Sequence, residues 1–231
     1  VKEKMNFSDL QINIWKRLYR IKSNGRLGSA YCFSGPAGSG KEYGAIEFSK
    51  LLNCQKDIET ACNKCESCFK FKSLQHPNLK IIVPLPSKPK SNKDSGALDG
   101  LKKEDIELLT NSMINKGKNP FYKINISNAR RITISSIRDL RRDIYLKSQT
   151  SGRKTILIFD AHLLSEGAGE SANALLKILE EPPNNTTLIL VTDKRSMLLP
   201  TILSRCQIIN FPGLSSKTIL KILESNSVEN K

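Results

Sequence analysis

The chain has 231 residues, of which 39% are hydrophobic and 26% charged, a balance typical of a globular protein with one large domain and a fragment of a second. The sequence shows neither a signal peptide nor an apolar span, so we expect a cytoplasmic protein without membrane partners. Lys and Arg outnumber Asp and Glu by 37 to 22, and the formal charge of +15 favours a polyanionic partner, although a solvated basic surface would give the same count.

The first predicted elements are a helix, a strand and a second helix. Residues 8–22 have the period of an amphipathic helix, with an apolar face formed by Leu10, Ile14, Leu18 and Ile21 and with Trp15 beside it. Residues 31–33 form a short apolar strand, and residues 43–52 form the second helix. The segment between them has the strand and helix neighbours that a phosphate-binding loop requires.

Residues 35–42, GPAGSGKE, match a phosphate-binding loop at every position except the last. The glycines (Gly35, Gly38 and Gly40) let backbone N–H groups turn towards phosphates, and Lys41 can reach the outer phosphates. The last position normally carries Ser or Thr, whose hydroxyl coordinates Mg²⁺, whereas Glu42 places a carboxylate there that opposes an anionic ligand. The motif predicts an anion site; ATP and Mg²⁺ binding stay open, with a glycine turn without a ligand as the alternative.

Four cysteines in the module 54–68 predict one metal site. Cys54, Cys62, Cys65 and Cys68 have the spacing C-x7-C-x2-C-x2-C. Closely packed thiolates repel one another unless a cation joins them, and tetrahedral zinc takes four sulfurs at such spacings. We expect a closed, structural Zn²⁺ site rather than disulfides or an iron–sulfur cluster, because the bacterial ferredoxin spacing differs.

The middle of the chain is predicted to carry an insertion. A short strand at 79–83 is closed by prolines, and from residue 87 to about 128 polar residues dominate around a short helix at 104–113. We expect this insertion to be partly mobile and to contribute little to the core.

Residues 136–146 predict an amphipathic helix with a basic outer face. Ser136 with Asp139 three places on is a weak capping box at its start. Arg138 and Arg142 share one face and Arg141 lies beside them, an arrangement that can follow a phosphate backbone. We expect DNA contact, if direct, at these three arginines; a solvated surface is the alternative.

The strand at 155–159 ends at Asp160, where a second nucleotide motif belongs. Two adjacent acids there would hold Mg²⁺ and polarise an attacking water, but position 161 is Ala. His162 is interpreted as a hydrogen-bonding residue rather than a base. Glu42 and Ala161 together argue against hydrolysis by this chain.

Strands and helices alternate along the chain, which predicts a parallel sheet in a three-layer α/β/α domain. The last third adds a helix ended by two prolines (171–183), a buried strand (188–192) and a turn that feeds a short helix (198–207). In this order, with the phosphate loop and the cysteines, the segments resemble the bacterial DNA polymerase III clamp-loader family of AAA+ proteins, and most of all its delta-prime subunits. The resemblance runs from about residue 10 to residue 214.

The resemblance implies a P-loop NTPase (AAA+) domain over 1–212 and the beginning of a helical lid over 213–231, without a collar domain. It assigns Arg205 to an arginine finger supplied in trans and Thr192 to sensing the outer phosphate, while local pairing with an acid is the alternative for Arg205. Departures such as Glu42 and Ala161 are common in delta-prime subunits.

The implied function is a non-hydrolysing subunit that serves a neighbouring ATPase while the sliding clamp is loaded onto primed DNA, with gamma/tau and delta subunits as partners. Three alternatives stay open. They are an active gamma/tau-type ATPase subunit of the same complex, a P-loop small-molecule kinase, and a zinc-dependent nucleic-acid-binding module with a vestigial loop.

Overall fold

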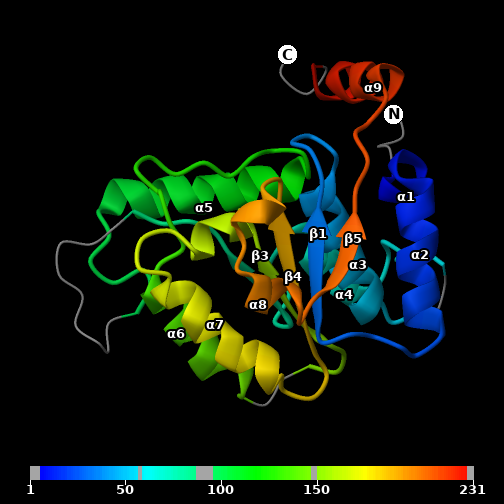
Figure 1. The fold of residues 1–231 in the computed structure, drawn as a ribbon. Helices are drawn as coiled ribbons and strands as arrows, with labels where there is room; N and C mark the ends of the chain where they lie inside the picture. Colours follow the sequence, from blue (N-terminus) through cyan, green and yellow to red (C-terminus); the bar gives the residue numbers. More distant parts are fainter. Residues whose placement is uncertain (1–5, 57–58, 87–95, 147–149, 228–231) are drawn as a thin grey trace.

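The computed structural model describes residues 6–56, 59–86, 96–146 and 150–227 (Figure 1). Its centre is a five-stranded sheet in the order β2-β3-β4-β1-β5, and all four strand pairs are parallel. The strands are β1 (Ala30–Ser34), β2 (Leu79–Ile82), β3 (Lys154–Ile158), β4 (Thr186–Thr192) and β5 (Gln207–Asn210). The predicted parallel α/β architecture is confirmed, and the predicted strands match within two residues at each end.

Helices cover both faces of the sheet, because successive strand residues point to opposite sides. Tyr31 and Phe33 of β1 belong to a core shared with α1 (Phe7–Leu10), α2 (Ile12–Ser23) and α3 (Lys41–Asn53). Ala30 and Cys32 belong to a second core, shared with α6 (Ile134–Ile144), α7 (Glu170–Glu180) and α8 (Pro200–Leu203). The three-layer prediction is therefore confirmed (Figure 1).

The helix predicted over 8–22 is interrupted at Gln11, between α1 and α2. The Gln11 side chain is buried, and its Nε2 donates to Ser39 O (3.0 Å) and Pro212 O (2.9 Å). Because an amide can satisfy two carbonyls only where they converge, Gln11 fixes the N-terminal segment against the phosphate loop and the chain that follows β5.

The described part of the 87–128 insertion contributes to the core, so the prediction of little core is wrong there. Its helix, α5 (Lys103–Lys118), is longer than the predicted 104–113, and Ile124 and Ile126 after it are buried in the first core. This apolar pair follows a polar run and sets no helical period, which is why the pattern hid it. Residues 87–95 of the insertion lie outside the described residues, and the partial mobility predicted for the insertion stays a prediction.

The remaining helices are close to the predictions, with one correction. Thr133 caps α6, since its Oγ1 accepts from Ser136 N (3.3 Å), so the capping box predicted at Ser136 is wrong and the helix begins two residues earlier. The other helical elements are α4 (Glu66–Lys72), η1 (Ala161–Leu164), η2 (Arg195–Met197) and α9 (Ser216–Ser227). Across the described ranges, every helix is too short or too polar to cross a membrane.

Candidate functional site

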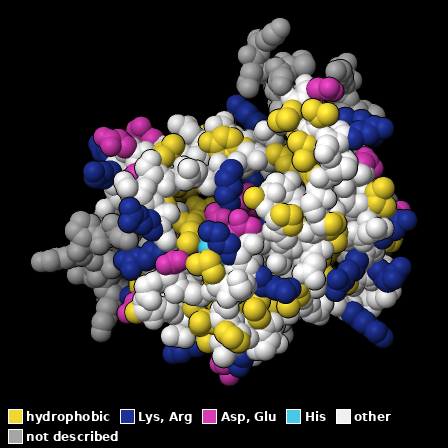
Figure 2. All heavy atoms as spheres, turned by 45° about the horizontal axis from the view of Figure 1, so that its top comes forward, with side chains coloured by type: hydrophobic (Ala, Val, Ile, Leu, Met, Phe, Trp, Pro, Cys, Tyr) yellow, Lys and Arg dark blue, Asp and Glu magenta, His cyan; other side chains and the backbone are white. Residues whose placement is uncertain are grey.

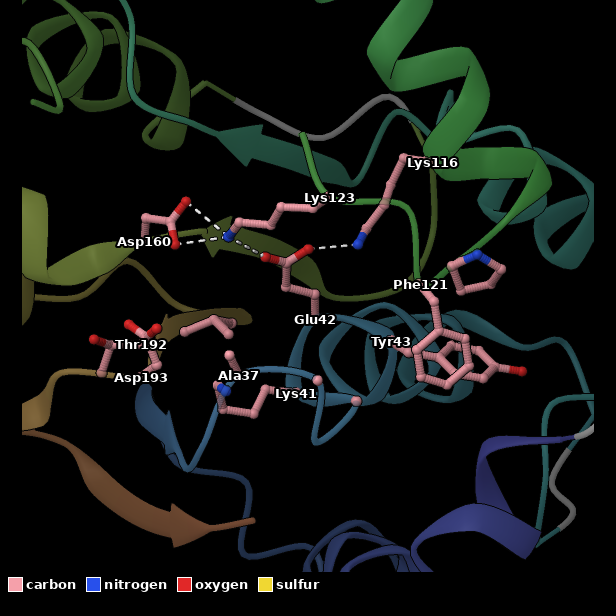
Figure 3. A pocket seen from close by; sticks show the side chains of 14 residues that line it. Ala37, Lys41, Glu42, Tyr43, Lys116, Phe121, Lys123, Asp160, Thr192 and Asp193 are labelled. Carbon is pink, nitrogen blue, oxygen red and sulfur yellow. Dashed lines mark hydrogen bonds and ion pairs between the residues drawn. The ribbon is translucent and has the colours of Figure 1, made fainter. Parts of the chain in front are cut away.

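A pocket of about 380 Å³ lies at the carboxyl edge of the sheet. The phosphate loop follows β1, Asp160 follows β3 and Thr192 ends β4, so parallel pairing brings all three to one edge. The fourth wall is the segment 116–123, at the end of α5 and beyond it (Figure 3). Figure 2 shows acidic and basic side chains side by side around a hollow near the middle of the face in view.

The backbone of the phosphate loop requires its glycines. Gly38 and Gly40 have φ of 75° and 81°, and a Cβ on Gly35 would lie 2.2 Å from Phe211 O, so glycine is required at each position. Lys41 is 7% exposed, and its Nζ donates to Pro36 O (2.6 Å) and Ser39 Oγ (3.3 Å). Burial lowers the pKa of Lys41. The loop lysine therefore folds back onto its own loop.

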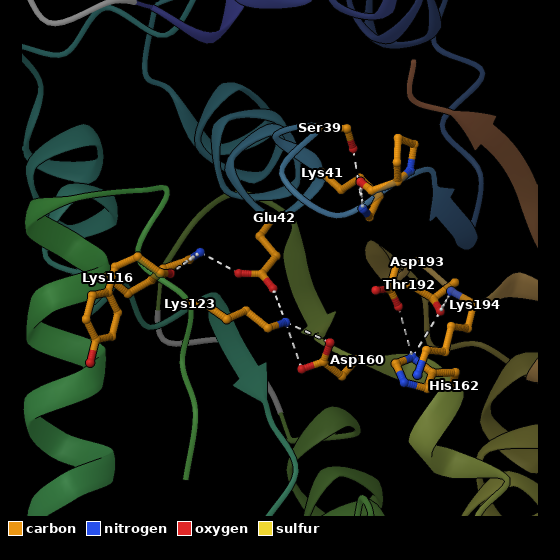
Figure 4. A network of polar contacts seen from close by, with 12 residues as sticks. Ser39, Lys41, Glu42, Lys116, Lys123, Asp160, His162, Thr192, Asp193 and Lys194 are labelled. Atoms are coloured by element: carbon orange, nitrogen blue, oxygen red, sulfur yellow. Dashed lines mark hydrogen bonds and ion pairs between the residues drawn. The ribbon is translucent and has the colours of Figure 1, made fainter. Parts of the chain in front are cut away.

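Glu42 does not stand as an isolated negative charge, because two lysines of the insertion pair with it. Its Oε2 accepts from Lys116 Nζ, and its Oε1 accepts from Lys123 Nζ at 2.8 Å (Figure 4). Burial alone would raise the pKa of Glu42, but the two ammonium groups outweigh it and lower that pKa. The expected repulsion of an anionic ligand by Glu42 is thus offset within the protein.

Lys123 also contacts Asp160, through both carboxylate oxygens at 2.7 and 2.8 Å. Its ammonium lies between the two acids (Figures 3 and 4). Burial alone would lower the pKa of Lys123, but Glu42 and Asp160 raise it above the usual value. Sequence reasoning missed Lys116 and Lys123, since they lie outside any motif in a Lys-rich stretch.

Thr192 lines the pocket, and its hydroxyl is already engaged. Thr192 Oγ1 lies 3.2 Å from His162 Nδ1 and accepts from Lys194 N at 3.0 Å. Burial lowers the pKa of His162, although Asp160 and Asp193 oppose that shift. His162 is therefore a buried, hydrogen-bonded residue, in line with the interpretation from sequence.

Arg205 is not one of the described residues that line the pocket. It follows α8, where its Nη2 pairs with Glu180 Oε1 (2.9 Å) and its Nη1 donates to Thr201 O (2.9 Å). Glu180 is therefore the nearby acid that the alternative interpretation of Arg205, a local ion pair, requires. About a third of the side chain remains exposed, so the guanidinium is accessible at the surface.

The three arginines predicted to contact DNA are exposed along α6. Arg142 forms an ion pair with Asp139 in the same helix. Arg138, Arg141 and Arg142 do not line the pocket among the described residues, so the structure separates the basic helix face from the phosphate loop.

The four cysteines of the 54–68 module converge as predicted. Their Sγ atoms all lie within 4.8 Å of one another, and those of Cys62 and Cys68 are 3.9 Å apart. Backbone N–H groups of Cys62, Cys65 and Cys68 point at Sγ atoms of the cluster at 3.3–3.5 Å, which favours thiolates. A tetrahedron with metal–sulfur bonds of about 2.3 Å has edges of about 3.8 Å, so the cluster can hold one metal ion after a small contraction.

A family model described as DNA polymerase III, delta subunit, matches residues 10–215. The chain belongs to this family. It is similar to DNA polymerase III subunit delta' of Bacillus subtilis, at 28% identity over 92% of this chain and 50% of the relative. It is also similar to subunit tau of B. subtilis, at 28% identity over 95% of this chain and 31% of the relative.

Subunit delta' of Pseudomonas aeruginosa is 29% identical over 87% of this chain and 50% of its own length. The chain thus spans half or less of the length of these relatives. Among solved structures, a gamma subunit-related protein of Thermotoga maritima matches with a TM-score of 0.47 at 17% identity, over 88% of this chain and 47% of that one. The family confirms the resemblance recognised in the sequence.

Proposed function

We propose that the chain forms part of a delta-prime-like clamp-loader subunit that does not itself hydrolyse ATP. The observation that carries this proposal is the state of Glu42, a carboxylate at the magnesium position that is already paired with Lys116 and Lys123. A hydrolysing site needs a neutral hydroxyl there and a pair of acids after the strand, and Ala161 occupies the second acid position. Any nucleotide would contact Gly35, Gly38, Gly40, Lys41 and Thr192.

In this proposal Arg205 acts on the nucleotide of a neighbouring subunit while the sliding clamp is loaded onto primed DNA. A planar, permanently charged guanidinium suits the charge that develops on a transferred phosphoryl group. The exposed position of Arg205 after α8 supports this role, because the group is accessible to a partner. Acting in trans requires Arg205 to exchange Glu180 for the partner's phosphates.

The test is ATPase activity on primed DNA of the full-length protein assembled with gamma/tau and delta subunits. Arg205→Ala should lower turnover at the affected site by up to ~10³-fold, and Arg205→Lys should recover only part of it. Glu180→Gln is the matched control, because it breaks the same ion pair but leaves the guanidinium in place. If all three variants keep the turnover of the unmodified assembly and lose a similar small amount of stability, Arg205 is only a local contact.

An active gamma/tau-type subunit is the second candidate, because the similarity to subunit tau equals that to delta' in identity. ATP turnover by the isolated full-length protein distinguishes this candidate from the non-hydrolysing subunit. ATP turnover at the rate of a motor subunit, abolished by Lys41→Ala, would favour the second candidate.

For the cysteine site we propose zinc in a structural role, because four thiolates complete a tetrahedral shell and leave no open position for chemistry. For DNA we propose contact through Arg138, Arg141 and Arg142, supported by their exposure on one helix and by the net charge of +15. Each phosphate that they neutralise would release counterions and make binding salt-dependent.

A further inference from the structure

One ammonium group joins three segments that are distant in the sequence. Lys123 Nζ lies 2.8 Å from Glu42 Oε1 at the start of α3, and 2.7 and 2.8 Å from the two oxygens of Asp160 after β3. Lys123 itself comes from the insertion (Figure 4). In phosphate-loop pockets, the residue after the loop lysine and the acid at the strand end share a divalent cation. The Lys123 ammonium stands between those two positions.

A magnesium ion does not fit the groups as they are arranged. All four carboxylate oxygens of Glu42 and Asp160 already accept from an ammonium group, three from Lys123 and one from Lys116. Mg²⁺ needs oxygens at about 2.0–2.1 Å in an octahedron, which these oxygens cannot supply while Lys123 lies between them. A dication beside that ammonium would also be repelled by its charge.

We propose that Lys123 replaces the divalent cation of this pocket. Its ammonium is a built-in counter-ion that holds the start of α3 to the end of β3, and the pocket consequently takes up no Mg²⁺ or Mn²⁺. This proposal concerns the cation alone and does not depend on the role proposed for Arg205.

The charges that line the pocket show why Lys123 alone decides whether the pocket binds a divalent cation. Three lysines (Lys41, Lys116 and Lys123) face three acids (Glu42, Asp160 and Asp193) in the pocket lining, so the set is balanced. Lys116 is buried at 2% exposure and stays on the far oxygen of Glu42. The Lys123 side chain is 55% exposed, so its removal would open the space between the two carboxylates to water and metal. A neutral residue there leaves one excess negative charge and a pair of hard oxygen ligands, which is a donor set for a divalent cation.

The experiment measures Mn²⁺ binding by electron paramagnetic resonance, and Tm with and without Mg²⁺, on the full-length protein with its cysteine site loaded with zinc. The unmodified protein should bind no Mn²⁺ at this pocket, and Mg²⁺ should leave its Tm unchanged. Lys123→Met should gain one Mn²⁺ per chain, and its Tm should rise by roughly 5–10 °C once free metal exceeds the Kd about a hundredfold. Adding Asp160→Asn to Lys123→Met should abolish that gain.

Two matched variants serve as controls. One removes a lysine charge outside the pocket, and the other changes Lys123 but keeps its positive charge. Lys103→Met, on the exposed side of α5, removes a lysine without touching the pocket and should behave like the unmodified protein. Lys123→Arg keeps a cation and should also remain insensitive to metal.

The proposal is overturned if the unmodified protein binds Mn²⁺ and Asp160→Asn removes that binding, a measurement that needs no Lys123 variant to fold. A folded Lys123→Met protein that gains no metal would overturn it equally.

Discussion

Replacing Lys116 with Met tests the buried half of the charge network. The Lys116 side chain is 1% exposed, and its Nζ pairs with Glu42, donates to Tyr122 O at 2.8 Å and lies 5.4 Å from the centre of the Phe159 ring. Met has a similar length and no charge, so packing against Phe159 is retained while the ion pair and one hydrogen bond are lost. The variant therefore removes the ion pair together with the hydrogen bond to Tyr122 O, and a double-variant comparison with Glu42 isolates the pair.

The expected loss of stability in Lys116→Met depends on the ion pair that Glu42 keeps with Lys123. Removing one partner of a buried ion pair costs about 3–5 kcal/mol when the other charge is left uncompensated. Glu42 keeps Lys123 as a second partner and is 15% exposed, so the loss should be smaller. We expect the free energy of unfolding to fall by about 2–3 kcal/mol, which lowers Tm by about 4–12 °C for a chain of this size.

The assay is urea unfolding of the zinc-loaded protein for Lys116→Met, Glu42→Gln and the double variant. Because each single variant removes the same contact, the double variant should be more stable than the sum of the two losses predicts, by about 1–3 kcal/mol. Losses that add within about 0.5 kcal/mol, or an unchanged Tm for Lys116→Met, would show that this pair does not stabilise the fold.

Four further outcomes are expected. The depressed pKa of Glu42 means that its stabilising charge is present above about pH 4.5 and is lost as pH falls through the folded-state pKa. The stability advantage of the unmodified protein over Glu42→Gln should therefore shrink as pH falls through this range, and stability curves that stay parallel for the two proteins would contradict this. Elemental analysis should find one zinc per chain, lost in Cys65→Ser with Cys68→Ser; retention would exclude the proposed site. Gly35→Ala should destabilise the protein measurably in calorimetry, since its Cβ would lie 2.2 Å from a backbone oxygen, and an unchanged Tm would refute that contact. Arg141→Ala should reduce the salt slope of binding to primed DNA by roughly one if it contacts a phosphate, and an unchanged slope would leave it a surface charge.

The sequence predicts those parts of the site whose chemistry is local. A phosphate loop needs glycines and a lysine at fixed spacing, and a four-sulfur cluster needs close cysteines, so both could be located before the structure was known. Gly38, Gly40 and the four cysteines lie where these patterns placed them. The buried strands of the parallel sheet were equally evident as apolar runs.

The parts that were missed depend on contacts between distant segments. Lys123 meets Glu42 across 81 positions and Asp160 across 37, and no local period marks a lysine that will become a counter-ion. Lys116 is almost fully buried although it belongs to a polar stretch, because its partner lies in another element. Gln11 breaks a helix whose apolar pattern is continuous, since its amide bonds two carbonyls far away in the chain. In each case tertiary contacts override the local pattern.

The two hydrogen bonds of Gln11 give the phosphate loop a mechanical link to the segment that leads to α9. One amide group holds Ser39 O inside the loop and Pro212 O where the chain leaves the sheet. Hydrogen bonds weaken steeply once donor and acceptor separate beyond about 3.2 Å, so neither carbonyl can shift by an ångström without releasing Gln11 or drawing the other along. The shape of the loop and the path of the chain towards its last described helix are therefore coupled: a change in one is transmitted to the other through the side chain of Gln11.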